Sequence, residues 1–491
     1  MIRKIGPALA LASGALLVLA STALANVALN QISSDPFTNS TAVDGVAIYH
    51  ATQVEPDTFA FGSTIVSAFQ VGRFHNGGSD DIGFAVSTNG GRTWKDGLLP
   101  GLTSQVDPAS PYERVSDASV AFDARHNVWI ISSIPLESNL VVPTVLFSRS
   151  TDGGRTWQAP VAMPAPSGPV NLDKNWSVCD NTSSSPFFGN CYTELDNFAR
   201  FDLELLTTSS DGGASWSVPI STPLHAHGLG GQPLVQPNGT VVVPFESIDG
   251  QAKIASFDST DGGATLTNAV TIATIDFHSV AGDLRTSPLP SAEIDGAGKV
   301  FVAWEDCRFE SGCPANDIVF STSSNGQSWS SVTKVPIPSV GSSVNDHFIP
   351  GLAVDKSTSG ATAHVGLSYY FYPNANCTVS SCELDSGFIS SPDGGASWGG
   401  NVQLAGPMTL SWLAFTTQGF MVGDYISTSW VNGTAFPVVA VASSGTPTQN
   451  LNEAMFTTSS GLAVSAGGTP AIPGASIGPS NLSFVAAPLN R

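Results

Sequence analysis

The sequence predicts an all-β protein, a β-propeller built from repeated four-stranded antiparallel sheets. A short turn motif, Ser-x-Asp/Asn-Gly-Gly-x-Ser/Thr-Trp, recurs along the chain. Only 12% of the residues are charged, while Gly (49) and Pro (33) are abundant. This composition is typical of short strands joined by tight turns. Long patterns with the 3.6-residue period of a helix are missing from residues 26–491.

The motif has a physical reason at each position. Asp or Asn folds its side chain back onto backbone N–H groups, and glycine accepts the positive φ of a tight hairpin. The tryptophan packs beneath the turn. Copies spaced by 50 to 68 residues indicate a repeat fold. The copies begin at Ser87, Ser150, Ser209, Ser259, Ser323 and Ser391. Two are less regular, because Leu266 replaces a tryptophan and one glycine is missing between Ser323 and Trp329.

Each motif follows a short apolar segment, and an earlier strand pair with its own turn precedes it, as in 119–122 and 128–131. Each unit is therefore predicted to be a four-stranded sheet with the motif between its third and fourth strands. Such sheets bury their faces by stacking on one another, and a closed ring leaves no open edge. Residues 420–456 form a further unit without the motif, and 43–50 are expected to supply its outer strand. Seven blades are favoured over six.

The N-terminus predicts export. Arg3 and Lys4 precede an apolar stretch that ends at Leu19, and Ala23 and Ala25 frame a small-residue cleavage site. A membrane anchor is the alternative, disfavoured because the stretch is short and contains Gly and Pro. We expect a signal peptide over 1–25, a leader over 26–42, the propeller over 43–460 and a tail rich in Gly, Ala, Pro and Ser over 461–491.

The charge balance excludes several partners. Residues 26–491 contain 16 Lys and Arg and 39 Asp and Glu, which gives a net charge of −23. Such a surface repels nucleic acid and anionic membranes, and repels a polyanionic ligand unless local arginines reverse the field. No later segment is apolar for long enough to cross a bilayer. We expect a monomer that is secreted, extracellular or periplasmic.

The six cysteines fall into three close pairs, which an exported chain is expected to oxidise to local disulfides. The pairs are Cys179 with Cys191, Cys307 with Cys313, and Cys377 with Cys382. A zinc site is disfavoured by the ligand spacing, and neither a metal nor another cofactor is expected as part of the site. Structural calcium is a separate option for the Gly/Ser-rich loops that contain Asp80, Asp81, Asp180 and Asn181.

Polar loops that enter the innermost strands are expected to converge at one end of the central channel, which favours a binding site there. Their carboxylates Asp117, Asp173 and Asp424 are candidate ligand-binding groups. The alternative is that these groups only satisfy strand ends and channel waters. The loops span 55–57, 114–117, 173–176, 230–232, 291–293, 346–348 and 423–425.

The turn motif and the stretch 72–82 resemble the sialidase or BNR-repeat (Asp-box) superfamily, in particular bacterial secreted sialidase-like proteins. The resemblance implies an acid/base at Asp80 or Asp81 and a tyrosine nucleophile, for which Tyr425 is a candidate beside Tyr369 and Tyr370. It also implies that arginines clamp a sugar carboxylate. The candidates for that clamp are Arg73, Arg114, Arg285 and Arg308.

The sequence departs from that family at the site, because the Phe/Tyr-Arg-Ile-Pro motif is missing. One hypothesis is therefore a secreted glycoside hydrolase of exo-sialidase type that recognises a glycan or glycoprotein. The second is a non-catalytic propeller that binds a glycan or a protein at the cell surface. A third is another glycan-cleaving chemistry that uses the axial carboxylates. If Arg73, Arg285 and Arg308 share one pocket, the sialidase hypothesis gains.

Overall fold

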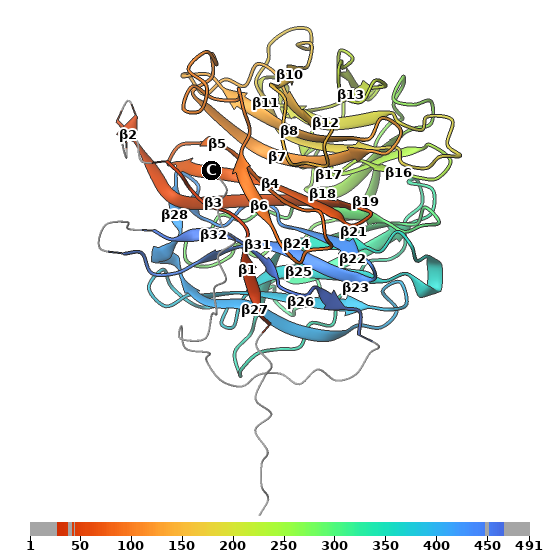
Figure 1. Ribbon diagram of the computed structural model, residues 1–491. Helices are drawn as coiled ribbons and strands as arrows, with labels where there is room; N and C mark the ends of the chain where they lie inside the picture. The colour runs from red at the N-terminus through yellow and green to blue at the C-terminus, as the bar shows by residue number, and fades with distance from the viewer. Residues whose placement is uncertain (1–26, 38–41, 44, 447–450, 466–491) are drawn as a thin grey trace, which may run out of the picture.

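The computed structural model describes residues 27–37, 42–43, 45–446 and 451–465 (Figure 1). This part of the chain is all-β, with strands β1 to β33. Its helical segments are three 3-10 turns, Phe198–Arg200, Gly360–Thr362 and Leu410–Trp412. Within the described ranges no helix has the length and apolarity needed to cross a membrane. The expected signal peptide, 1–25, lies outside them.

Most strands belong to units of about four antiparallel strands, which we name by their first strand; three of these units are joined at their edges into one 14-stranded sheet. The β3 unit contains β3 (Val46–Phe61), β4 (Thr64–Phe74), β5 (Ser79–Ser87) and β6 (Lys95–Leu98). The β7 unit contains β7 (Arg114–Asp123), β8 (Val128–Leu136), β9 (Leu146–Ser150) and β10 (Val161–Ala162). The β11 unit contains β11 (Leu172–Cys179), β12 (Cys191–Asn197), β13 (Leu203–Ser209) and β14 (Ile220–Ser221).

The second half of the chain repeats this layout. The β15 unit contains β15 (Gly228–Leu229), β16 (Leu234–Val235), β17 (Val241–Ser247), β18 (Lys253–Ser259) and β19 (Val270–Thr274). The β20 unit contains β20 (Ser291–Ile294), β21 (Val300–Asp306), β22 (Asp317–Ser323) and β23 (Thr333–Lys334). The β24 unit contains β24 (Asp346–Val354), β25 (Val365–Tyr372), β26 (Glu383–Ser391) and β27 (Gly399–Thr409).

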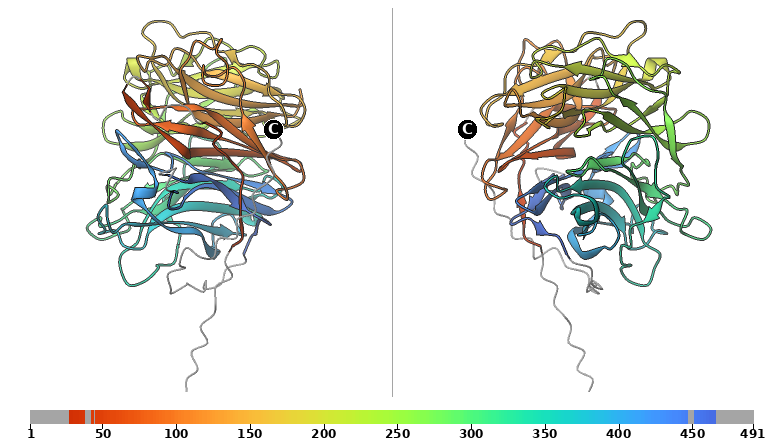
Figure 2. Two further views of the ribbon diagram at one scale, coloured as in Figure 1. Left: turned by 60° about the vertical axis from the view of Figure 1, so that its left-hand side comes forward. Right: turned by 90° about the vertical axis from the view of Figure 1, so that its right-hand side faces the viewer.

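The last unit is completed by the beginning of the chain. It contains β30 (Ser427–Val431), β31 (Thr434–Ala442) and β32 (Glu453–Thr458), and its outer strand is β1 (Leu29–Gln31), which pairs with β32. The expectation that 43–50 supplies this strand is wrong, because most of that segment belongs to β3 and pairs with β4. Figure 2 shows the red N-terminal strands beside the blue C-terminal ones. The remaining short strands are β2 (Ala42–Val43), β28 (Ala414–Thr416), β29 (Gly419–Met421) and β33 (Leu462–Ala463).

Hairpin turns form at the repeated motif as its residues predict. In the third copy, Ser209 Oγ accepts a hydrogen bond from Gly213 N at 2.9 Å, and Asp211 Oδ1 accepts one from Ser215 N at 2.9 Å. Trp216 is buried beneath the turn and stacks on Phe147 of the preceding unit, with ring centroids 3.8 Å apart. The motif therefore closes a hairpin and also joins neighbouring units.

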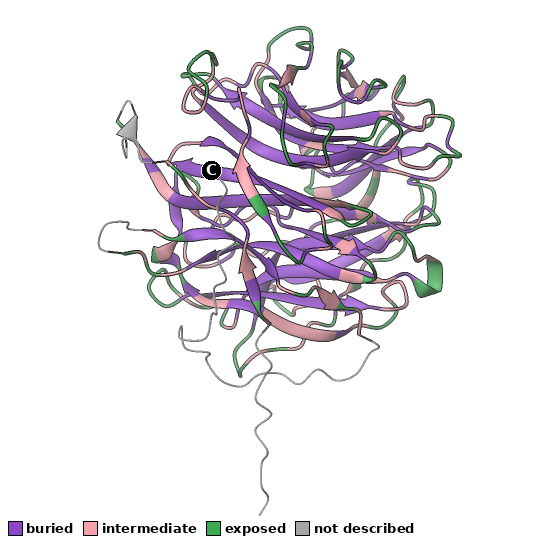
Figure 3. Cartoon of the chain, in the orientation of Figure 1, coloured by how far each residue is buried: buried purple, intermediate pink, exposed green. Residues whose placement is uncertain are grey.

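The core lies between the faces of successive units, and the strands are buried while the loops are exposed (Figure 3). One cluster joins Ile130 and Phe147 of the β7 unit to Leu195 and Leu205 of the β11 unit. First strands also contact one another in succession, β3 with β7, β7 with β11, β11 with β16, β16 with β20, β20 with β24, β24 with β30 and β30 with β3.

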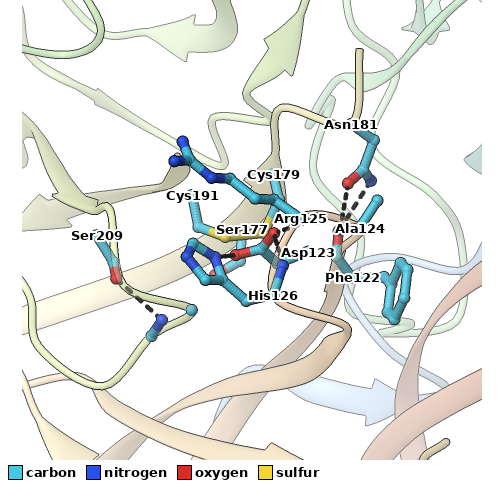
Figure 4. Close-up of a disulfide and its surroundings, with 12 residues drawn as sticks. Phe122, Asp123, Ala124, Arg125, His126, Ser177, Cys179, Asn181, Cys191 and Ser209 are labelled. Atoms are coloured by element: carbon cyan, nitrogen blue, oxygen red, sulfur yellow. Dashed lines mark hydrogen bonds and ion pairs between the residues drawn. A yellow bond between two sulfur atoms is a disulfide. The ribbon is translucent and has the colours of Figure 1, made fainter. Parts of the chain in front are cut away.

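All three predicted disulfides are formed, Cys179–Cys191, Cys307–Cys313 and Cys377–Cys382. The first joins β11 to β12 at their shared turn (Figure 4). Beside it, Asn181 donates to Phe122 O and accepts from Ala124 N, each at 2.8 Å, so its side chain ties the β11 unit to the β7 unit. The described residues contain no group of three His, Cys, Asp or Glu side chains placed to hold a metal ion.

Candidate functional site

Matching bulges occur in the first strands of several units. The register of β3, β7, β11 and β24 shifts between residues 54 and 57, 116 and 119, 173 and 176, and 348 and 351. Inside each shift one residue takes a left-handed backbone, at Glu55 (φ 56°), Asp117 (φ 50°), Lys174 (φ 42°) and Ile349 (φ 50°). Left-handed conformations of such residues are costly and gather at functional sites. Three of the four positions carry a charged side chain.

These charged side chains meet in one buried ion network. Lys174 Nζ contacts Asp424 Oδ2 and lies 3.4 Å from Asp117 Oδ1 and 3.9 Å from Glu55 Oε1. Arg285 binds both carboxylate oxygens of Asp424, with Nε 2.7 Å from Oδ1. The network therefore holds two cations and three carboxyl groups from units far apart in the sequence.

The network sets its carboxyl groups to different protonation states. Burial raises the pKa of Glu55 to about 7, although Lys174 opposes the shift. Burial, helped by the charge of Asp117, raises the pKa of Asp173 to about 6. Burial also disfavours the charge of Asp424, but Arg285 and Lys174 outweigh it and hold the pKa of Asp424 well below its usual range. Asp424 is therefore an anion at neutral pH.

A cavity opens directly above this network. Its volume is about 380 Å³, a figure that includes open solvent at its entrance. Half-buried Trp176 and the edge of Tyr425 form an aromatic wall, with ring centroids 5.1 Å apart in an edge-to-face arrangement. The lining residues are Lys174, Asn175, Trp176, Gly230, Gly231, Gln232, Leu289, Pro290, Pro350, Asp424 and Tyr425. We call this cavity the mouth pocket.

The sheets have two ends, one near the mouth pocket and one at the repeated turns. Leu172 of β11 pairs with Asn197, which pairs with Leu203, so these residues share the end near Lys174. Cys179 pairs with Cys191, which pairs with Ser209, so the repeated turns occupy the other end. We call the two ends the mouth end and the turn end.

Only one of the four candidate arginines is bonded into the network. Arg285 binds Asp424, while buried Arg73 donates to Gly78 O at 2.6 Å and burial lowers its pKa to about 10. Arg114 lies over the ring of Phe74, 4.1 Å from its centroid. Arg308 binds Asp306 of its own unit. Arg73, Arg285 and Arg308 therefore do not form one clamp.

The residues that the resemblance assigns to catalysis are buried. Asp80 and Asp81 are 0% exposed, and burial raises the pKa of Asp81 well above its usual range. Tyr425 lines the mouth pocket, but its hydroxyl donates to Ala118 O at 3.1 Å, and burial raises its pKa well above the ordinary value. The phenol therefore donates to a backbone carbonyl, whereas an activated nucleophile would donate to a carboxylate.

The axial loops predicted from the sequence include every network residue except Arg285, but sequence reasoning gave no role to Glu55, Lys174 or Trp176. Of the three predicted axial carboxylates, Asp117 and Asp424 lie in the network, while Asp173 is the neighbour of Lys174 in the chain. Glu55, Lys174 and Asp117 share a left-handed backbone at the bulge of a first strand, and their residue types do not mark that position in the sequence.

No family model matches the chain, and no curated protein matches it. Solved structures resemble it at low identity. They include the phage phi92 endosialidase, 9% identical over 90% of this chain and 70% of that chain with a TM-score of 0.49. An ulvan lyase is 10% identical over 90% and 97%, with a TM-score of 0.48. A protein of unknown function from Dyadobacter fermentans is 16% identical over 75% and 98%, with a TM-score of 0.47.

Proposed function

We propose that the chain is a seven-bladed β-propeller whose turns are Asp-boxes. The succession of contacts between first strands supports it, because the succession returns from β30 to β3. A second cavity supports it as well, since its lining comes from β3, β7, β11, β20, β24 and β30 and from the segment around β16. A cavity lined by every first strand is what a propeller channel requires. The three disulfides support a secreted, extracellular or periplasmic location.

We infer that the protein binds a glycan in the mouth pocket. The observation that carries this inference is the half-buried Trp176, which stands beside Lys174, Asn175 and Gln232 at the open end of the channel. A sugar ring has an apolar C–H face and a rim of hydroxyl groups. An aromatic wall beside a few convergent polar groups matches both.

The charges of the site favour a neutral glycan. Arg285 is bound through two nitrogens to Asp424, so it offers no free fork to a sugar carboxylate. The positive charges of Lys174 and Arg285 face the carboxyl groups of Asp424, Asp117 and Glu55. The whole chain carries a net charge of −21. An anionic sugar therefore meets a field that opposes it.

Binding to an array of neutral and sialylated glycans tests this function. We expect the purified protein to bind neutral glycans and to ignore their sialylated counterparts. Retention of sialylated glycans alone would contradict the neutral-ligand proposal. No retention of any glycan, by a protein whose folded state is verified by circular dichroism, would contradict glycan binding.

A second candidate function is glycoside hydrolysis at the same place. It is favoured by the contrast between Glu55, whose pKa is raised to about 7, and Asp424, whose pKa is lowered. Two carboxyl groups with separated pKa values suit an acid and its charged partner. Hydrolysis of fluorogenic neutral glycosides that Glu55→Gln abolishes would support it. Hydrolysis of a fluorogenic sialoside that is lost in Arg73→Ala and in Asp80→Ala or Asp81→Ala would instead support the exo-sialidase type.

A further inference from the structure

Two loops of the mouth end expose large apolar side chains. The turn between β12 and β13 presents Phe198, 62% exposed, and Phe201, 83% exposed. The loop between β14 and β15 presents Leu224, 78% exposed. Contiguous exposed apolar side chains on a soluble domain mark a surface that contacts a ligand or partner. We call these three side chains the apolar platform.

The two loops are bonded to each other. Gly228 N donates to Asp202 O at 2.8 Å, and Glu204 N donates to Ala226 O at 3.0 Å. These bonds bring the loop that carries Leu224 against the strand that follows Phe201. The two loops that carry the platform are therefore held together by backbone hydrogen bonds.

The backbone of Phe201 is in a strained, left-handed conformation. Phe201 has a φ of 61°, Asp202 a φ of 54° and His225 a φ of 55°, all in the left-handed region. A bulky residue rarely adopts this conformation, and glycine would take the position of Phe201 without strain. The ring of Phe201 is exposed and its backbone is strained, and together these features indicate that the ring contacts a ligand and not the protein core.

The platform continues from the mouth pocket. Gly228, which bonds the β12–β13 turn, is followed two residues later by Gly230, which lines the pocket. On the other side, Asp196 of β12 pairs with Asp173, the neighbour of Lys174. The same β11 and β15 units thus supply one wall of the pocket and the platform outside it (β11 to β13 lie at the top of Figure 1).

We propose that the apolar platform is a distal subsite for a neutral oligosaccharide whose terminal sugar occupies the mouth pocket, an inference that rests on the proposed glycan binding. Successive sugar rings present apolar faces along the chain. The ring of Phe201 and the side chains of Phe198 and Leu224 give those faces an apolar surface without charge. The preferred ligand is therefore a neutral glycan of several residues.

Calorimetric titration with cello-, malto- and manno-oligosaccharides of one to six residues tests the proposal. We expect the affinity to rise with chain length in one series. Phe201→Ala should lower the affinity for the longest ligand of that series about tenfold, which corresponds to the loss of one aromatic contact. The same variant leaves the affinity for the monosaccharide unchanged. Phe61→Ala is the matched control, because Phe61 is 44% exposed at the turn end.

A second variant separates binding from folding. Phe201→Gly is expected to raise Tm, since glycine relieves the left-handed strain, and to lower long-ligand affinity as Phe201→Ala does. Affinity that does not depend on chain length, or equal losses for long and short ligands, would overturn the distal subsite and leave the mouth pocket standing. Failure to bind any ligand of the three series would overturn the subsite together with the binding function.

Discussion

The aspartates of the turn end and the buried acids of the mouth end differ in their hydrogen-bond partners. Burial alone would raise the pKa of Asp211, but hydrogen bonds from the Ser215 hydroxyl and backbone N–H outweigh it and lower that pKa. In contrast, burial raises the pKa values of Glu194, Asp196 and Glu204, and neighbouring carboxyl groups add to the shift. Both oxygens of Asp196 lack a hydrogen-bond donor among the described residues. The turn aspartates are therefore held as anions by donors of their own turns, whereas these three acids of the mouth end are buried among other carboxyl groups.

Exposed apolar side chains follow the same division. Phe198, Phe201, Phe309 and Val379 stand in loops of the mouth end, while the turn end exposes Phe61 and Val218. Repeated turns stabilise the framework, and the opposite loops are free to vary and to carry a site. Function is therefore expected at the mouth end.

The largest effect is expected from the ion network of the mouth end. Asp424→Asn leaves Lys174 and Arg285 buried with a weakened counter-charge, and should lower the free energy of unfolding by about 3–5 kcal/mol. Urea denaturation at pH 7 measures the loss. Asp211→Asn at the turn end is the control, because Asn89 and Asn325 form the same turn in other copies. A loss below about 1 kcal/mol for Asp424→Asn would show that the network is not essential to the fold.

A smaller effect, opposite in sign, is expected for Glu204 of the mouth end. Burial raises its folded pKa to about 8, above the unfolded value, so its contribution to stability is fully present in acid and is lost as the pH rises towards 8. Glu204→Gln should therefore raise the free energy of unfolding by about 2 kcal/mol at pH 8 and leave it unchanged at pH 4. Scanning calorimetry against pH checks this. An equal change at both pH values would contradict a protonated Glu204.

The smallest effect is expected at a single turn. Asp211→Ala removes the acceptor for Ser215 N and for two hydroxyl groups, and should cost about 1–2 kcal/mol at pH 7. Since the folded pKa of Asp211 is lowered, the cost should shrink as the pH falls below about 3.8. Denaturation at pH 7 and pH 3 measures it, and a cost that grows in acid would exclude the charged carboxylate as the stabilising group.

Local patterns made the framework predictable. Each turn motif lies within eight residues, and each disulfide joins cysteines 5 to 12 residues apart, so spacing alone identified them. The outer strand β1 has three residues and no strand pattern, which is why a longer segment was preferred for its place. Its position is decided by pairing with β32, far along the chain.

The candidate site depends on contacts that spacing does not reveal. Lys174 and Asp424 are separated by 250 residues, and only closure of the fold brings them together. Arg308 is the opposite case, since its partner Asp306 is only two residues away in the sequence. Left-handed backbone at Glu55 and Lys174 also has no sequence signature, because glycine is the residue that normally marks it.

Two tryptophans at opposite ends of the sheets allow the most direct test of the account. Trp176 lines the mouth pocket, and Trp430, also half-buried, lines a cavity of about 500 Å³ at the turn end. Titration of the tightest-binding neutral glycan into the wild type, Trp176→Ala and Trp430→Ala measures the contribution of each. The account predicts that binding is lost in Trp176→Ala and retained in Trp430→Ala. Retained binding in Trp176→Ala, or loss in Trp430→Ala alone, would contradict a glycan site at the mouth end.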